Sequence, residues 1–248
     1  RIRTTGCSTA RRSLPRHQSP APAAEYMLDR LSIVIPAGPG DSAWQGLLPQ
    51  LQLISAREIV LVRTDIDGAL ATRLPANVRE IRSVTGRARQ MNAGAAAGTG
   101  DWLWFLHADS RVTPASIAAL TRFIAKDCDA IGYFDLRFLS DGPGLMAINT
   151  FGTWWRTRLF GLPFGDQGFV MPRRVFDALA GFDERLPSAE DHALVWTARR
   201  ANVPIKSVGA FIHTSARKYA QRGWWKTTCQ HLTLTWSQAR TFSREDAG

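Results

Sequence analysis

The sequence predicts an α/β fold in which a mostly parallel sheet has helices on both faces. Short apolar runs, rich in β-branched residues, recur through the first half of the chain, and segments with a helical pattern lie between most of them. Near-continuous apolar runs are typical of strands that are buried on both faces. Their alternation with helices favours parallel pairing. With 248 residues, of which 45% are hydrophobic, the chain can bury one substantial core.

Four strands are expected in the first half, each an apolar run that ends at polar or glycine-containing sequence; they cover residues 31–36, 58–62, 78–81 and 102–106. After the first strand, Asp41 or Ser42 is expected to cap a helix that reaches about residue 54. A second helix is expected after Arg87, because small residues fill Gln90–Ala97 before a Gly-Thr-Gly turn.

The second half continues this pattern with less regular spacing. Thr113-Pro114 predicts the start of a helix that ends near residue 125, because proline favours the first helical turn. Ser188 and Asp191 have the spacing of a capping box at the start of a further helix. The remaining expected elements are a strand at 130–139, an irregular glycine- and aromatic-rich segment at 141–168, helices at 173–179 and 188–200, and a strand at 203–208.

The net charge of +10 is carried by the two ends of the chain. Residues 1–26 hold five arginines and one glutamate, and residues 199–248 hold nine basic and two acidic residues. The intervening residues 27–198, with 17 basic and 18 acidic residues, are almost neutral. This neutral centre and the lack of a nucleic-acid-binding motif argue against a nucleic-acid partner. The basic C-terminal segment fits a nucleotide diphosphate, an acidic membrane surface or a solvated face.

Three regions are expected along the chain. Residues 1–26, rich in arginine, serine, proline and alanine, are interpreted as a disordered extension or as translation upstream of a start at Met27, with a transit peptide as the alternative. Residues 27–218 form the α/β domain. Residues 219–248 form an aromatic and basic helical segment that either packs on this domain or lies at a membrane surface.

The sequence also bears on location. It contains no secretory signal and no apolar run of the roughly 18 residues that a membrane span requires. Cys7, Cys128 and Cys229 are too scattered for a metal site, and their odd number does not suggest a disulfide framework. These features predict a reducing, cytoplasmic location, with peripheral contact to the inner face of a membrane as a further option.

The strongest indication of chemistry is the sequence GRARQMNAGAAAGTGDWLWFLHAD, which ends at Asp109. Asp109 follows a buried strand, and α/β sheets bind ligands at the carboxyl ends of their strands. A carboxylate there suits a divalent cation held against a phosphate-bearing substrate. His107 is a second candidate ligand, which suits Mn²⁺ better than Mg²⁺. The structural alternatives are a helix or turn cap for Asp109 and a hydrogen-bonded histidine for His107.

The strings GRxxQMNxGA, FLHAD and GDQ and an adjacent Glu-Asp pair occur in this order, and with them the chain resembles the family 2 glycosyltransferases, in particular a branch of small bacterial single-domain enzymes. The resemblance covers roughly residues 31–230. It implies the GT-A fold, which is Rossmann-like with a mostly parallel sheet, and transfer of a sugar from a nucleotide-sugar to an acceptor hydroxyl with inversion. It also implies a divalent cation, Mg²⁺ or Mn²⁺, at Asp109, where the family has an Asp-x-Asp motif whose first residue is here His107.

The resemblance assigns roles to further residues. Glu190 and Asp191 match the family's acidic pair, so Asp191 is expected to be the general base for the acceptor hydroxyl and Glu190 its neighbour; helix capping by acids is the alternative. Asp166 and Gln167 are expected to contact sugar hydroxyls, unless they form a plain turn. The residues expected to bind the nucleotide-sugar donor are Asp65, Arg87, Arg89, Gln90, Asn92 and Arg217. Arginine suits a diphosphate because it donates paired hydrogen bonds, although these arginines also fit solvated surface charges.

Two departures from the family pattern concern the loops near the donor. After the first strand, Ala37-Gly38-Pro39-Gly40 replaces the usual acidic residue or asparagine, and Asp41 comes later. After the second strand, Arg63 stands where the family usually has the first acid of a nucleoside-binding string, with Asp65 and Asp67 further along. The three aspartates are therefore weaker candidates for contacts to the base or ribose, and the sequence does not fix the nucleotide.

Together these features predict a metal-dependent inverting glycosyltransferase. Two alternatives share its donor site: a nucleotidyltransferase, which would release pyrophosphate, and a catalytically degraded protein that binds a nucleotide-sugar without turnover. A dinucleotide oxidoreductase is disfavoured because no G-x-G-x-x-G follows a strand. The acceptor is not identified, and a lipid is one candidate.

Overall fold

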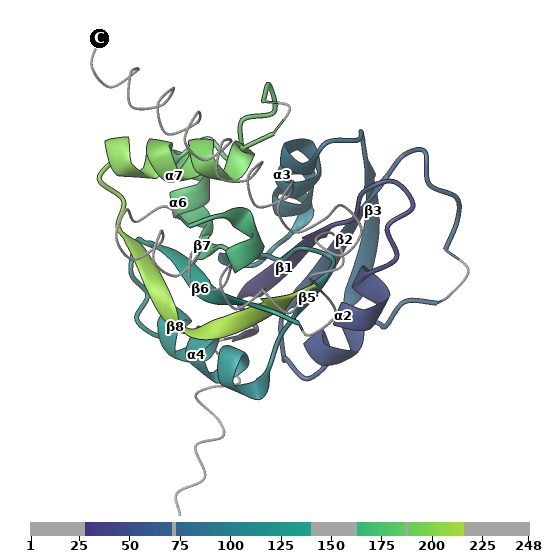
Figure 1. Cartoon of the computed structure of the whole chain (residues 1–248), viewed down its shortest axis with the longest axis horizontal. Coiled ribbons are helices and arrows are strands. Elements are labelled where there is room, and N and C mark those ends of the chain that lie inside the picture. The colour runs from purple at the N-terminus through teal and green to yellow at the C-terminus, as the bar shows by residue number, and fades with distance from the viewer. Residues whose placement is uncertain (1–27, 71–72, 140–162, 187, 216–248) are drawn as a thin grey trace, which may run out of the picture.

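A sheet of eight strands runs through the centre of the described part of the computed structural model, which comprises residues 28–70, 73–139, 163–186 and 188–215 (Figure 1). The strands are β1 (Leu31–Pro36), β2 (Glu58–Thr64), β3 (Val78–Ser83), β4 (Trp102–Phe105), β5 (Ser110–Arg111), β6 (Ile131–Phe138), β7 (Val170–Pro172) and β8 (Ile205–Thr214). The helices are α2 (Trp44–Leu51), α3 (Arg87–Ala97), α4 (Pro114–Ile124), α6 (Arg173–Ala178) and α7 (Glu190–Arg200), together with the 3-10 turn η1 (Gly165–Gln167).

The strand order is β3-β2-β1-β4-β7-β6-β8-β5. The first four strands in this order pair in parallel. Strand β7 is antiparallel to both β4 and β6, so β6 and its parallel neighbour β8 run in the same direction as β1. Strand β5 is antiparallel to β8. Six of the eight strands in the described residues therefore share one direction, which confirms the predicted mostly parallel sheet.

Two apolar clusters cover the two faces of the sheet, as the sequence predicted. Ile33 and Ile35 of β1 belong to the cluster that includes residues of α2 and α4. Val34 belongs to the cluster that includes residues of α3, α6 and α7. This alternation along a strand with no exposed residue is the pattern of a strand buried on both faces.

Helix α3 lies unusually close to the sheet because of its small residues. A Cβ atom at Gly94 would overlap the side chain of Val34 and lie 2.9 Å from Cγ2 of Val62. The close approach brings the start of α3 to the carboxyl ends of β1 and β2, and it explains why this helix is rich in glycine and alanine.

Most predicted elements are confirmed, and the differences concern short or late elements. The strand predicted at 203–208 is wrong in extent, because β8 runs from Ile205 to Thr214. The connection between β2 and β3 contains no helix in its described residues. Strands β5 and β7 and the turn η1 were not predicted, since each has only two or three residues and offers no periodicity to recognise.

Both helix caps that the sequence predicted are wrong, whereas α4 has a cap that was not predicted. Thr113 caps α4 and forms a capping box with Ser116. The box predicted for Ser188 and Asp191 is wrong, because α7 has Ala189 as its N-cap residue, without a side-chain cap hydrogen bond. The predicted cap of α2 is also wrong, since its N-cap residue is Ala43.

Several expectations lie outside the described residues. They concern residues 1–26, the whole segment 219–248, most of the aromatic-rich segment 141–168, and Arg217. In the part of the chain that the structure describes, no helix has the length and apolarity needed to span a membrane.

Candidate active site

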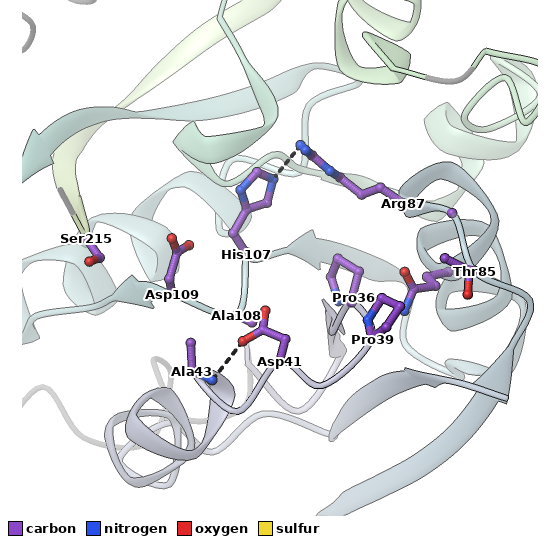
Figure 2. Close-up of a pocket in the computed structure, with 13 residues that line it drawn as sticks. Pro36, Pro39, Asp41, Ala43, Thr85, Arg87, His107, Ala108, Asp109 and Ser215 are labelled. Atoms are coloured by element: carbon purple, nitrogen blue, oxygen red, sulfur yellow. Dashed lines mark hydrogen bonds between the residues drawn. The ribbon is translucent and has the colours of Figure 1, made fainter. Parts of the chain in front are cut away.

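A cavity of about 490 Å³ opens at the carboxyl ends of β1 and β4 (Figure 2). Its walls come from three chain segments that are distant in sequence: residues 36–43 after β1, residues 85–90 at the start of α3, and residues 107–109 after β4. Ser215, directly after β8, also lines it. This is the edge at which α/β sheets bind ligands, because loops from several parallel strands meet there.

Asp109 and His107 project to the same side of the loop that follows β4 (Figure 2). Within the described residues the half-buried Asp109 carboxylate has no hydrogen-bond or ion-pair partner. His107 instead has its Nε2 atom 3.4 Å from Nη1 of Arg87. The carboxylate is therefore available to a ligand, whereas the imidazole faces a guanidinium cation.

These residues fit a divalent cation only when the substrate supplies further ligands. No group of three or more His, Cys, Asp or Glu side chains that could hold a metal occurs among the described residues. Mg²⁺ is commonly bound by one or two carboxylates together with water and substrate phosphates, and the unpaired Asp109 in an open cavity suits that mode. His107 is the weaker candidate ligand, because a cation at its Nε2 would lie beside Arg87.

Arg87 lies between the carboxyl group of Glu190 and the imidazole of His107. Its Nε atom lies 3.1 Å from Oε1 of Glu190, at the start of α7, and its other end faces His107. The Glu190 side chain is only 5% exposed. Burial raises the pKa of Glu190, and the nearby Asp191 carboxylate adds to this, while the positive charge of Arg87 opposes it.

Asp191 is held by two backbone N–H groups. Its Oδ2 atom accepts a hydrogen bond from Gly165 N–H at 2.6 Å, and its Oδ1 atom accepts one from His192 N–H at 2.9 Å. Burial on its own would raise the pKa of Asp191, but the Gly165 hydrogen bond and the charge of Arg87 outweigh it and lower the pKa. Asp191 is thus an ionised carboxylate beside Glu190, a carboxyl group with the opposite shift.

Gly165 lies close both to the loop after β4 and to the start of α7. A Cβ atom there would lie 3.1 Å from Oδ2 of Asp191 and 3.4 Å from Nε2 of His107. His107 and Asp191 therefore both lie close to the same backbone position, although 84 positions separate them in the sequence.

The side chains of two predicted binding residues, Gln90 and Gln167, form hydrogen bonds with backbone groups. The Gln90 amide donates to the carbonyls of Ala37 at 2.6 Å and Val62 at 3.0 Å, which joins the ends of β1 and β2. Gln167 is 1% exposed; it accepts from Phe164 N–H and donates to the Phe134 carbonyl. Gln90 still lines the cavity, but both glutamines use these amide groups to hold the loops in place.

Other predicted residues lie away from the cavity. Asn92 bonds the backbone of Phe182 and the carboxylate of Glu184, and it lines a separate cavity of about 900 Å³ between α3, α7 and the loop before α7. Asp65 and Arg89 are exposed and do not line the 490 Å³ cavity. Asp166 lies in η1, next to Gly165. Donor or sugar contacts by these residues stay predictions.

The cavity also contains residues that sequence analysis ranked low or missed. Asp41, a weaker candidate, lines it together with Thr85 and Ser215. Thr85 directly precedes the GRxxQ string, which was the available signal. The ion pair between Arg87 and Glu190 was not anticipated, because nothing in the sequence links residues 103 positions apart.

We expect Arg87→Gln to destabilise the protein more at about pH 8 than at about pH 5. Without Arg87 the folded-state pKa of the buried Glu190 rises further above its unfolded-state value. The variant therefore keeps its free energy of unfolding at low pH, where Glu190 is protonated. It loses part of that free energy as the pH rises from the unfolded-state pKa of Glu190 to its folded-state pKa. At about pH 8 we expect the substitution to lower the free energy of unfolding by about 1–2 kcal/mol more than at about pH 5. This is less than for a fully buried ion pair, because the Arg87 side chain is 49% exposed.

Urea unfolding at the two pH values measures this effect. Arg89→Gln, two positions along the same helix and exposed, is the matched control. An equal loss of stability at both pH values would show that Arg87 does not stabilise the charged form of Glu190.

Comparisons with known proteins agree on the nature of this fold. Residues 63–178 match the family model described as glycosyl transferase family 2. The match includes Arg87, His107 and Asp109 and ends before Glu190 and Asp191, and it is shorter than the span over which the motifs resemble the family. A comparison with curated protein sequences gives no match.

Solved structures with the GT-A fold are similar to the chain. TarS residues 1–349 from S. aureus gives a TM-score of 0.55 at 15% identity, covering 75% of this chain and 60% of TarS. The same fragment with UDP-GlcNAc gives 0.54 at 16% identity, covering 75% and 58%. GalNAc-T7 with UDP, GalNAc and Mn²⁺ gives 0.57 at 17% identity, covering 75% and 43%. The predicted GT-A fold is confirmed, and the chain spans 60% or less of these neighbours.

Proposed function

Because residues 63–178 match glycosyl transferase family 2 and the described residues have the GT-A fold, we propose that this protein is a glycosyltransferase. It moves a sugar from a nucleotide-sugar to an acceptor hydroxyl, with inversion at the anomeric carbon. Inversion in a single step requires a base for the acceptor and stabilisation of the leaving diphosphate, and the candidate site offers groups for both.

The observation that carries the proposal is the convergence of Asp109 and Asp191 on one region. Asp109 follows β4 and lines the cavity, with His107 on the same loop. Asp191 lies in the first turn of α7 and is bonded to Gly165, the residue whose Cβ position faces His107. Two carboxylates would therefore have separate tasks, Asp109 at the leaving diphosphate of the donor and Asp191 at the hydroxyl of the acceptor.

Asp109, Arg87 and His107 form the donor side in this proposal. A divalent cation held by Asp109 would neutralise the charge that develops on the departing diphosphate. Arg87 lines the cavity, and its guanidinium suits phosphate oxygens because it donates paired hydrogen bonds in a fixed plane. His107, on the same loop as Asp109, faces Arg87 and orients its guanidinium.

Asp191 is the base on the acceptor side. The acceptor oxygen forms a bond to the anomeric carbon, the bond from that carbon to the diphosphate oxygen breaks, and the acceptor proton passes to Asp191. Its lowered pKa keeps the carboxylate ionised, and the two backbone N–H groups fix its direction. The buried Glu190 contributes a second carboxyl group, whose pKa burial raises and the charge of Arg87 lowers.

The neighbouring structures suggest which donor to test first. TarS is in complex with UDP-GlcNAc, and GalNAc-T7 is with UDP, GalNAc and Mn²⁺. At 15–17% identity these proteins share the fold alone, so the base and the sugar must be tested across several donors.

We expect one nucleotide-sugar to raise the melting temperature of the protein. The panel comprises UDP-, GDP-, CDP- and dTDP-sugars, each with and without Mn²⁺. At a ligand concentration of about 100 times Kd, mass action adds about 2.7 kcal/mol, which corresponds to a rise of roughly 5–10 °C for a domain of this size. No shift with any donor, with or without the metal, would contradict the proposed donor site.

The reaction product separates transfer from the nucleotidyltransferase alternative. Transfer releases a nucleoside diphosphate, which chromatography resolves from pyrophosphate. Release of pyrophosphate would replace the proposed function, and binding without release of either product would indicate a protein that binds a nucleotide-sugar without turnover.

A further inference from the structure

One wall of the cavity is the turn Gly38–Asp41, which follows β1. Asp41 N–H donates to the Gly38 carbonyl at 3.0 Å, and Gly40 has φ of +68°. Proline followed by glycine with positive φ at the centre of a turn is the signature of a type II turn. Gly38, Pro39 and Asp41 line the cavity, whereas Gly40 does not; Figure 2 shows Pro39 and Asp41. The hydrogen bond from Asp41 to Gly38 fixes the shape of the turn, whereas its position beside the cavity depends on hydrogen bonds to residues outside the turn.

The Asp67 carboxylate bonds this turn to the end of β2. Oδ1 of Asp67 accepts a hydrogen bond from Gly40 N–H at 2.9 Å. Oδ2 of the same side chain accepts from Thr64 N–H at 3.1 Å and from the Thr64 hydroxyl at 2.7 Å. Thr64 is fully buried at the end of β2. Asp67 therefore ties the turn after β1 to the last residue of the neighbouring strand.

The loop that carries Asp67 is itself fixed by arginines. Arg82 donates to the carbonyls of Thr64 and Gly68, each at 2.9 Å. Arg63 donates to the Gly68 carbonyl at 3.0 Å, and Glu80 contacts both guanidinium groups, at 3.1 Å for Arg63 and 2.8 Å for Arg82. Arg63 occupies the position at which the resemblance expects a nucleoside-binding acid. Here it supports the loop, and the acid lies four positions further on.

We propose that Asp67 is a positioning residue for donor binding, which fixes the Gly38–Asp41 wall through the Gly40 N–H. This inference rests on the proposed function, since it names the residue that shapes the donor cavity. Asp67 does not line the cavity and touches neither Asp109 nor Asp191. The hydrogen bonds from Thr64 and Gly40 also lower the pKa of Asp67, so the carboxylate accepts both throughout the neutral range.

Kinetics of three variants test this role. Asp67→Ala removes every acceptor and should raise the donor KM about tenfold, with kcat changed less than about twofold, because the groups at the reacting atoms stay in place. Asp67→Asn keeps an acceptor for Gly40 and should raise the donor KM by less than about threefold. Asp101→Ala, which removes an exposed carboxylate paired with Arg30, is the control and should match the wild type.

An unchanged donor KM in Asp67→Ala would overturn the proposal, as would a fall in kcat as large as the fall in kcat/KM. Hydrogen exchange of the peptide covering residues 38–43 provides a second measurement that needs no donor. Exchange should be faster in Asp67→Ala and unchanged in Asp67→Asn and Asp101→Ala. Wild-type exchange rates in Asp67→Ala would contradict the role of Asp67 even if no donor is found, whereas a wild-type protein inert to every donor would contradict the proposed function alone.

Discussion

Replacing Asp191 with asparagine should lower the rate of sugar transfer roughly 100-fold or more, because an amide cannot accept the acceptor proton. The side chain keeps its shape and an oxygen that can accept from Gly165 N–H, so the protein should remain folded. Release of nucleoside diphosphate, measured at saturating donor and acceptor, gives the rate. The loss should be similar at about pH 6 and about pH 8, because the lowered pKa of Asp191 keeps the wild-type base ionised at both.

The matched control for this prediction is Asp177→Asn, which changes an exposed carboxylate on α6. It should retain wild-type turnover, and both variants should bind the donor as the wild type does. Near-normal turnover in Asp191→Asn would remove the assignment of Asp191 as the base and would direct attention to the adjacent Glu190.

Replacing Asp109 with alanine should also lower turnover by about 100-fold or more, through the leaving group rather than the acceptor. The carboxylate has no partner in the described structure, so its removal should leave the melting temperature of the free protein almost unchanged. The Mn²⁺-dependent part of the donor-induced rise in melting temperature should disappear. His107→Ala should reduce the Mn²⁺-dependent rise in melting temperature less than Asp109→Ala does, because the Nε2 atom of His107 faces Arg87 and is the weaker candidate ligand.

The two variants thus have different signatures. Asp109→Ala alters the metal dependence of donor binding, whereas Asp191→Asn alters turnover alone. A wild-type dependence on Mn²⁺ in Asp109→Ala would show that any cation is held elsewhere, and it would contradict the donor side of the account.

Long elements were predictable from the sequence because burial on both faces leaves an unmistakable pattern. β1 was predicted to the residue, and β2, β4, α3 and α4 within a few positions. Strand β7 could not be predicted, since three residues do not establish a periodicity and its antiparallel insertion between β4 and β6 is a tertiary feature. The caps of α2 and α7 failed because residues with good capping side chains stand near the helix start without occupying the cap position.

The candidate site was predictable where position along a strand determines function. Asp109 lies at the carboxyl end of β4, as expected, and Arg87 and the Glu190-Asp191 pair approach the same region from two helices. Amide side chains were less predictable. Gln90 and Gln167 have residue types that suit a sugar or a nucleotide, but the sequence does not reveal that backbone carbonyls elsewhere in the chain engage them.

The most direct test of the central claim is a crystal structure with Mn²⁺ and the nucleoside diphosphate whose sugar conjugate gives the largest thermal shift. We expect the diphosphate to lie between the Asp109 carboxylate and the Arg87 guanidinium, with Asp191 facing the space next to the terminal phosphate, where the sugar would lie. A diphosphate bound away from Asp109, or an Asp191 side chain directed away from that space, would contradict it.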